Sequence, residues 1–218
     1  MEWDRQIDAY CERLGPGLWA EPVNALTNAG FVLAALWLWP RVRGLPVARA
    51  LCLLLAATGL GSALFHTFAT PWAALLDVLP VAGFVLLYLY AANRRYLGLG
   101  RVSALAVTAA FPPAVALLAP VLARLPGLSS SAVYWPVPLL IAGYAALLAR
   151  GAPRLARGLT TGAALLTLSL AARSLDGPVC PALPLGTHFL WHLLNAAMLG
   201  WMIWVYRRHV LEARTPGR

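Results

Sequence analysis

The sequence contains no lysine and few acidic residues: all 17 basic residues are arginine, and only eight residues are Asp or Glu. Charged residues make up 11% of the chain, against roughly a quarter in soluble globular domains. These shortages exclude a soluble enzyme and a disordered chain. The net charge of +9 does not indicate a nucleic-acid partner, because the arginines are spread over short loops instead of gathering on one face.

Long apolar stretches are present instead. Hydrophobic residues form 61% of the chain, and seven stretches of about 17–21 residues are each long enough to cross a hydrocarbon core of ~30 Å. We therefore expect an all-α, polytopic membrane protein with one domain, 1–218. Pro112 and Pro113 predict a kink in the fourth span. The predicted spans are 23–39, 48–68, 72–92, 102–122, 132–149, 155–172 and 186–206.

The arginines also predict an orientation. Thirteen lie in loops on one side of the predicted spans, and four lie on the other, namely Arg5, Arg13, Arg124 and Arg173. The positive-inside rule then places the N-terminal segment 1–22 outside and the tail 207–218 in the cytoplasm. The composition, rich in arginine and alanine, suggests a bacterial cytoplasmic membrane with the outer end facing the periplasm.

The three cysteines fit this topology. Cys52 falls within the second span, where we expect a small packing residue. Cys11 and Cys180 both fall on the predicted outer side, where an oxidising compartment permits a disulfide. We expect this bridge to tie the N-terminal segment to the start of the last span; two unrelated thiols are the alternative.

Ionisable residues within the spans are few and share one predicted depth. His188 and His192 are four residues apart on the last helix and therefore lie on one face. Ser62 and His66 have the same spacing near the end of the second helix, and Asp77 opens the third. Since burying an Asp at the centre of a membrane helix costs about 2.5–3.5 kcal/mol even on lenient scales, we interpret this group as a functional site.

Three neutral imidazoles from two helices could hold zinc with an open fourth position, as in hydrolytic zinc sites. The pKa of a bound water would fall to about 7, Asp77 could accept its proton and pass it to the leaving group, and Ser62 could donate a hydrogen bond to the oxyanion. The alternative is that the histidines are hydrogen-bonded links between helices. The fourth histidine, His209, is expected to be a solvated residue among arginines.

Several motifs resemble those of the alkaline ceramidase family, which belongs to a superfamily of seven-span metal hydrolases that includes the adiponectin-receptor-like proteins. The resemblance covers nearly the whole chain in order and spacing. It is carried by the pair Cys11–Glu12 and by Ala20–Asn28 (AEPVNALTN), Gly61–Thr67 (GSALFHT), Leu76–Pro80 (LDVLP) and Thr187–Leu194 (THFLWHLL).

The resemblance implies hydrolysis of the ceramide amide to a sphingoid base and a fatty acid. Carried over residue by residue, it implies a zinc ion bound by the three histidines, with Asp77 as the acid/base residue and Ser62 supporting the oxyanion. The zinc ligands would be His66, His188 and His192.

The resemblance further implies a calcium ion near the N-terminus. Asp8, Glu12 and Glu21 would supply its oxygen ligands. The sequence departs from the family here, because Ala9 stands where an aspartate is expected and the stretch from Glu12 to Glu21 is shorter. A solvated acidic segment is therefore the alternative to a calcium site.

Other functions are compatible with the same residues. The first is a zinc hydrolase that acts on another lipid amide or ester. The second is a transporter or proton pathway in which Asp77 and the histidines form a relay, and the third is a receptor-like protein with a structural histidine cluster. For a hydrolase, the expected partners are the lipid bilayer and a ceramide-like membrane lipid that reaches the site sideways.

Overall fold

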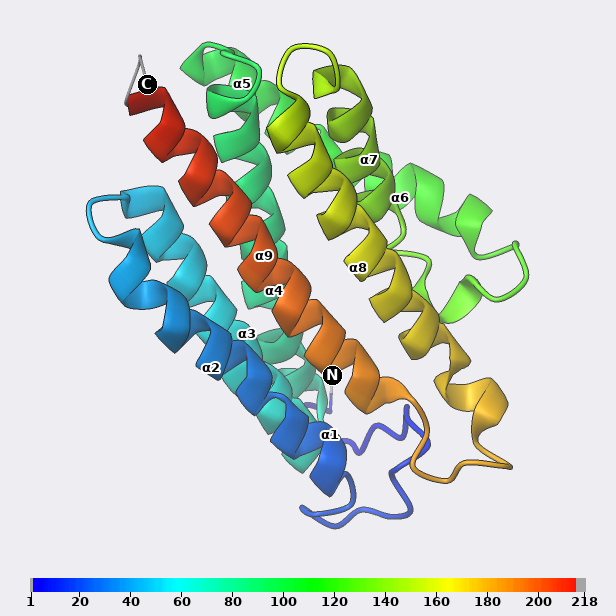
Figure 1. The fold of residues 1–218 in the computed structure, drawn as a ribbon. Coiled ribbons are helices and arrows are strands. Elements are labelled where there is room, and N and C mark those ends of the chain that lie inside the picture. Colours follow the sequence, from blue (N-terminus) through cyan, green and yellow to red (C-terminus); the bar gives the residue numbers. More distant parts are fainter. Residues whose placement is uncertain (1, 215–218) are drawn as a thin grey trace.

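The computed structural model describes residues 2–214 as an all-α structure, with no strand in that part of the chain (Figure 1). Residues 215–218 of the predicted tail lie outside the described residues, as does residue 1. The helices are α1 (Pro22–Thr27), α2 (Ala29–Leu38), η1 (Trp39–Val42), α3 (Pro46–Phe68), α4 (Pro71–Arg95), α5 (Arg101–Ala109), α6 (Phe111–Leu122), η2 (Ser129–Ser131), α7 (Pro136–Leu148), α8 (Pro153–Val179) and α9 (His188–Arg214).

Among the described residues, six helical stretches are long and apolar enough to cross a membrane. They match six of the seven predicted spans and are Pro22–Val42, Pro46–Phe68, Pro71–Arg95, Arg101–Leu122, Pro153–Val179 and His188–Arg214. The fourth contains the expected interruption, since α5 ends at Ala109 and α6 begins at Phe111, directly before the two prolines.

The predicted span 132–149 differs from the structure. Its helix, α7, has 13 residues, which at 1.5 Å per residue is about 20 Å, less than the ~30 Å of a hydrocarbon core. Residues 132–135 form turns, and the helix begins at Pro136, a residue that suits a first helical position because it has no N–H to satisfy.

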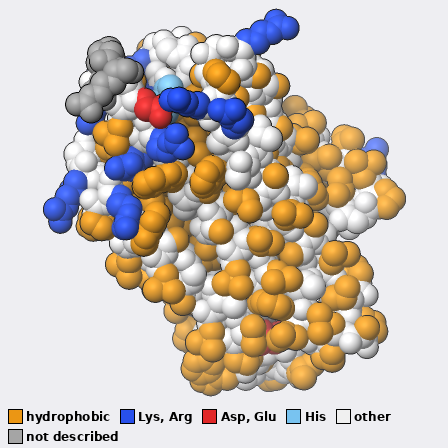
Figure 2. Space-filling view, viewed as in Figure 1, with side chains coloured by type: hydrophobic (Ala, Val, Ile, Leu, Met, Phe, Trp, Pro, Cys, Tyr) orange, Lys and Arg blue, Asp and Glu red, His pale blue; other side chains and the backbone are white. Residues whose placement is uncertain are grey.

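The outer surface of the bundle is apolar, as Figure 2 shows over most of the visible face. Leu33, Leu60 and Leu105 come from three different helical stretches, and each is more than 60% exposed. Contiguous apolar surface of this extent is rare on soluble monomers. The helices therefore present to their surroundings the side chains that a lipid bilayer accommodates.

Helix α9 runs through the middle of the bundle and contacts α1, α2, α3 and α8 (Figure 1). Helices α3 and α4 form an antiparallel pair, joined by a short turn in which Ala69 has the left-handed φ of 48°. A Cβ atom at Gly61 would lie 1.9 Å from the carbonyl oxygen of Leu76. Glycine is therefore required for this approach, which brings Ser62 of α3 next to Asp77 of α4.

The N-terminal segment 2–21 crosses the end of the bundle at which α3 finishes and α9 begins (Figure 1). The backbone N–H of Ile7 donates to the carbonyl of Ala69 at 2.7 Å. A disulfide joins Cys11 to Cys180, which confirms the predicted bridge, and Cys52 is buried as a free thiol in α3. The segment is thus attached at both α3 and the α8–α9 loop, over the predicted histidine site.

Candidate metal centre

Three histidines that are distant in sequence come together at this end of the bundle. His66 lies in the last turn of α3, and His188 and His192 lie one turn apart at the start of α9. One ring nitrogen from each lies within 4.8 Å of the others, and all three residues are at most 2% exposed. The structure therefore brings together the three residues that the spacing predicted as zinc ligands.

Each of these histidines has one buried ring nitrogen without a hydrogen-bond partner: Nε2 of His66, Nδ1 of His188 and Nε2 of His192. A buried polar atom left unpaired destabilises a fold by about 1–3 kcal/mol. Because the three side chains also offer ring nitrogens within 4.8 Å of one another, a metal ion at this position could pair with one nitrogen of each residue. Zinc is the metal typically held by three neutral imidazoles.

In His66 and His192, the hydrogen bond made by Nδ1 determines that Nε2 is the nitrogen with a free lone pair. The carboxylate of Glu21 only accepts hydrogen bonds, so Nδ1 of His66, 2.5 Å from Glu21 Oε2, donates its proton. The Thr27 hydroxyl donates to the carbonyl of Val23 at 2.8 Å and therefore accepts from Nδ1 of His192 at 3.0 Å. Both rings then keep a lone pair on Nε2, as a metal ligand requires.

Glu21 is ionised in this arrangement. Burial by itself would raise the pKa of its carboxyl, but hydrogen bonds from His66, Arg13 and Asn24 outweigh burial and hold the pKa below its usual value. The carboxylate is 1% exposed, and Asn24 Nδ2 donates to its Oε2 at 3.1 Å. Glu21 therefore acts as a fixed anion behind His66, an arrangement typical of histidines that bind metals.

His188 is held through its backbone and its ring face. Its N–H and that of Thr187 both donate to Oδ1 of the buried Asp176, at 2.9 and 2.8 Å, and the Cys11 N–H donates to Oδ2 at 3.0 Å. The ring of Tyr10 stacks on the imidazole with centroids 3.6 Å apart. Asp176 thus caps the start of α9 and joins it to the N-terminal segment.

Ser62 and Asp77 line the same cavity as His188, a hollow of about 400 Å³. The Asp77 carboxylate lies close enough to Ser62 and to His66 for both side chains to interact with its charge. Tyr10 lines the cavity as well, and burial raises the pKa of its phenol to about 12. An acid, several hydroxyl groups and one of the three clustered histidines therefore border one space.

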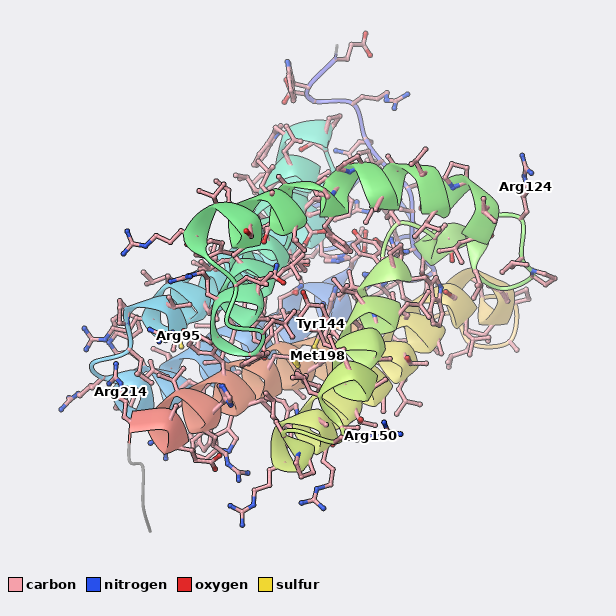
Figure 3. The ribbon with its side chains drawn as sticks, turned by 90° about the horizontal axis from the view of Figure 1, so that it is seen from above. Arg95, Arg124, Tyr144, Arg150, Met198 and Arg214 are labelled. Carbon is pink, nitrogen blue, oxygen red and sulfur yellow. A yellow bond between two sulfur atoms is a disulfide. The ribbon has the colours of Figure 1, made fainter. Side chains whose placement is uncertain are left out.

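A second cavity lies beside the first. It measures about 750 Å³ and is lined almost entirely by apolar and aromatic side chains of α4, α7, α8 and α9. Tyr144 and Met198, which Figure 3 labels near the centre of the bundle, belong to this lining. Val81, Tyr134, Trp191 and Asn195 line both cavities, so the polar and apolar spaces adjoin.

The three carboxylates predicted for calcium are not brought together. Asp8 is exposed, and both oxygens of Glu12 accept backbone N–H groups at the start of α1, from Val23 at 2.6 Å and Asn24 at 2.8 Å. The Glu21 oxygens are occupied by Arg13, His66 and Asn24. Because N–H donors already use these oxygens, the residues do not fit a calcium site.

Several residues that build the centre, Tyr10 among them, were not predicted from the sequence. Thr27 and Asp176 carry no separate signal in the sequence, although Thr27 lies in the Ala20–Asn28 motif. From the sequence, Arg13 and Arg173 are predicted only to lie on the outer side, and nothing in their spacing places them at the histidines. Arg173 lines the polar cavity, and its Nη2 donates to the Tyr10 hydroxyl at 3.4 Å.

No model of a known protein family and no curated protein matches this chain. The resemblance to alkaline ceramidases therefore depends on the motifs quoted above, and the geometry of the centre has to support a function by itself.

Proposed function

We propose that this protein is an intramembrane zinc hydrolase that cleaves a lipid amide, with ceramide as the substrate that the family resemblance favours. The observation that carries the proposal is the set of three buried, unpaired histidine nitrogens next to an acid and a serine. Helix-linking histidines, the competing interpretation, would use these nitrogens in hydrogen bonds between helices.

The residues divide the chemistry between them. Zinc held by His66, His188 and His192 would supply a water whose pKa is lowered to about 7. Asp77 accepts a proton from the attacking water and returns it to the leaving amine. Ser62 lies next to the Asp77 carboxylate, and its hydroxyl would donate a hydrogen bond to the oxyanion.

A lipid substrate is supported by the adjoining cavities. The polar hollow would receive the amide and headgroup, and the apolar cavity of about 750 Å³ would receive a hydrocarbon chain. The same arrangement would also admit other lipid amides or esters, which are the alternative substrates.

The orientation belongs to the same proposal. We place the metal centre on the outer, periplasmic side of a bacterial cytoplasmic membrane and the end of α9 in the cytoplasm, with α7 and the turns before it forming the fifth of seven passes. The arginines gathered near the C-terminal end of α9 in Figure 2 support this orientation. A disulfide at the opposite end suits an oxidising compartment.

The test is metal content and hydrolysis by detergent-purified protein. We expect about one zinc per chain and release of fatty acid from a ceramide, both lost in His192→Ala. The matched control is His209→Ala, since His209 lies on the same helix at the other end and bonds to the Arg95 carbonyl. If the protein hydrolyses other lipid amides or lipid esters but not ceramide, the alternative substrate class is indicated.

Wild-type protein without zinc, purified in the absence of chelator, would contradict the hydrolase. Zinc without hydrolysis of any lipid amide or ester would favour a receptor-like protein with a structural cluster. Proton or solute flux in vesicles that depends on Asp77 would favour a transporter.

A further inference from the structure

Arg13 is a buried cation in the N-terminal segment. Its side chain is 2% exposed, and that of its partner Glu21 is 1% exposed. Nε of Arg13 donates to Glu21 Oε1 at 2.5 Å, and Nη2 donates to the carbonyl of His66 at 3.1 Å. Nη1 donates to the carbonyl of Gly15 at 3.2 Å and more weakly to that of Gly17 at 3.5 Å. One carboxylate and three carbonyls thus surround the guanidinium.

Carboxylate and backbone carbonyl oxygens are the ligands that calcium takes in proteins. Here the positive charge between these oxygens is the guanidinium of Arg13, and it pairs with them without an added ion. A calcium ion brought to Glu21 would meet the guanidinium charge at contact distance, and charges of one sign repel strongly in a buried environment. Arginine and calcium are therefore alternatives at this position.

The same guanidinium contacts the metal centre from two directions. It fixes the Glu21 carboxylate that accepts from His66 Nδ1, and it holds the backbone carbonyl of His66 itself. His66 is therefore positioned by Arg13 both through its ring and through its backbone. Removing the cation would leave the Glu21 charge buried and unbalanced, which destabilises a fold far more than losing an exposed pair.

We propose that Arg13 is a built-in replacement for the calcium ion that the family resemblance implies, and that it positions Glu21 and His66 for metal binding. The centre of this protein is then independent of calcium. Arg13 is a positioning residue, since it touches neither the substrate cavity nor the unpaired histidine nitrogens. Its action on zinc rests on the proposed function, whereas its role as the cation next to Glu21 does not.

The first experiment measures zinc affinity by chelator competition on metal-stripped protein. We expect Arg13→Ala to bind zinc 10- to 100-fold more weakly, the usual effect of losing a residue that orients a ligand. Arg5→Ala is the matched control, because Arg5 lies in the same segment but is exposed, and it should bind zinc like the wild type. Arg13→Lys keeps the positive charge but cannot donate from three separate nitrogens as the guanidinium does. Its zinc affinity should therefore lie between those of Arg13→Ala and Arg5→Ala.

The second experiment adds millimolar calcium to metal-stripped protein and measures Tm. We expect no shift for the wild type, Arg5→Ala or Arg13→Lys, and an increase for Arg13→Ala, in which Glu21 and the carbonyls are released to bind an added cation. The same calcium should restore part of the lost zinc affinity of Arg13→Ala. Magnesium, which binds poorly to flexible carbonyl-rich sites, serves as the ionic control.

A wild type that calcium stabilises, or a folded Arg13→Ala that binds zinc normally and ignores calcium, would overturn the proposal. If Arg13→Ala does not fold, a folded Arg13→Lys decides: insensitivity to calcium supports the proposal and stabilisation by calcium overturns it. If no variant binds zinc, the hydrolase fails, but the calcium measurement still separates a built-in cation from a simple salt bridge.

Discussion

At the end of the bundle where the chain begins, one group of ionisable side chains is buried; at the end where α9 finishes, the ionisable side chains are mostly exposed. The buried group comprises Glu12, Arg13, Glu21, His66, Asp176, His188 and His192. At the other end, Arg208 and Glu212 form an ion pair whose side chains are 50% and 52% exposed. His209 there is partly exposed and hydrogen-bonded to a carbonyl.

The difference supports the proposal that the metal centre lies at the end where the chain begins. Burying charges is unfavourable by several kcal/mol per ion unless partners and hydrogen bonds compensate, and Glu12, Arg13, Glu21 and Asp176 all have such partners. Among the ionisable groups of the buried end, the uncompensated atoms are the three histidine nitrogens. At the other end most arginines need no such partners, because water and lipid headgroups solvate them; Arg49, whose Nε is buried without a partner, is the exception there.

The largest effect that would test this contrast is expected for Asp77→Asn. The substitution keeps the size of the side chain but removes the proton acceptor, so hydrolysis should fall by roughly 10²–10⁴-fold, while zinc content stays at the wild-type level. Metal analysis and initial rates on the same preparation check both parts. Full activity in Asp77→Asn would show that another group performs the proton transfer.

Loss of the disulfide should come next. Cys11 and Cys180 are 169 residues apart in sequence, and removing a native disulfide typically destabilises a small protein by about 2–5 kcal/mol. We expect Cys180→Ser to lower Tm, and reduction of the wild type to lower it equally. Cys52→Ser is a control for a buried thiol outside the bridge, and it should not change the response to reductant. An unchanged Tm in Cys180→Ser would mean that hydrogen bonds alone hold the segment.

A smaller effect is expected for Thr27→Val, which keeps the shape of the side chain but removes the oxygen that accepts from His192 Nδ1. Zinc affinity should fall about 10-fold, at the lower end of the range for residues that orient a ligand. Thr67→Val is the matched control, since Thr67 makes the same type of bond to a helix carbonyl, 2.8 Å from Ala63. Equal zinc affinity in both variants would remove Thr27 from the centre.

The smallest effect is expected at the exposed end. Arg208→Ala removes a half-exposed ion pair with Glu212, one turn further along α9. Such pairs contribute about 0–1 kcal/mol to the free energy of unfolding. Tm and zinc content should therefore stay near the wild-type values. A loss of zinc in Arg208→Ala would contradict the division of the molecule into two ends.

Part of the centre was predictable because helix periodicity is local. The four-residue spacings of Ser62 with His66 and of His188 with His192 place each pair on one face, and alternation of apolar stretches and loops brings the end of α3 to the start of α9. The 13-residue α7 was not predictable in this way. The residues just before α7 are as apolar as the helix itself, although residues 132–135 form turns. Hydrophobicity alone therefore does not reveal where the helix begins.

The sequence by itself determined the apolar helices, the arginine asymmetry and the four-residue histidine and serine spacings, since these depend on composition and short spacings. It predicted the Cys11–Cys180 bridge only through the expected topology, with two free thiols as the alternative, and the structure decided for the bridge. Only the tertiary structure decided the partners of the charged groups: Arg13 with Glu21, Asp176 with the start of α9, and Thr27 with His192. The physical reason is that a buried charge takes whichever partner the packing of distant segments brings within hydrogen-bond distance. That packing pairs the Glu21 carboxylate with Arg13, a partner that no short spacing in the sequence indicates.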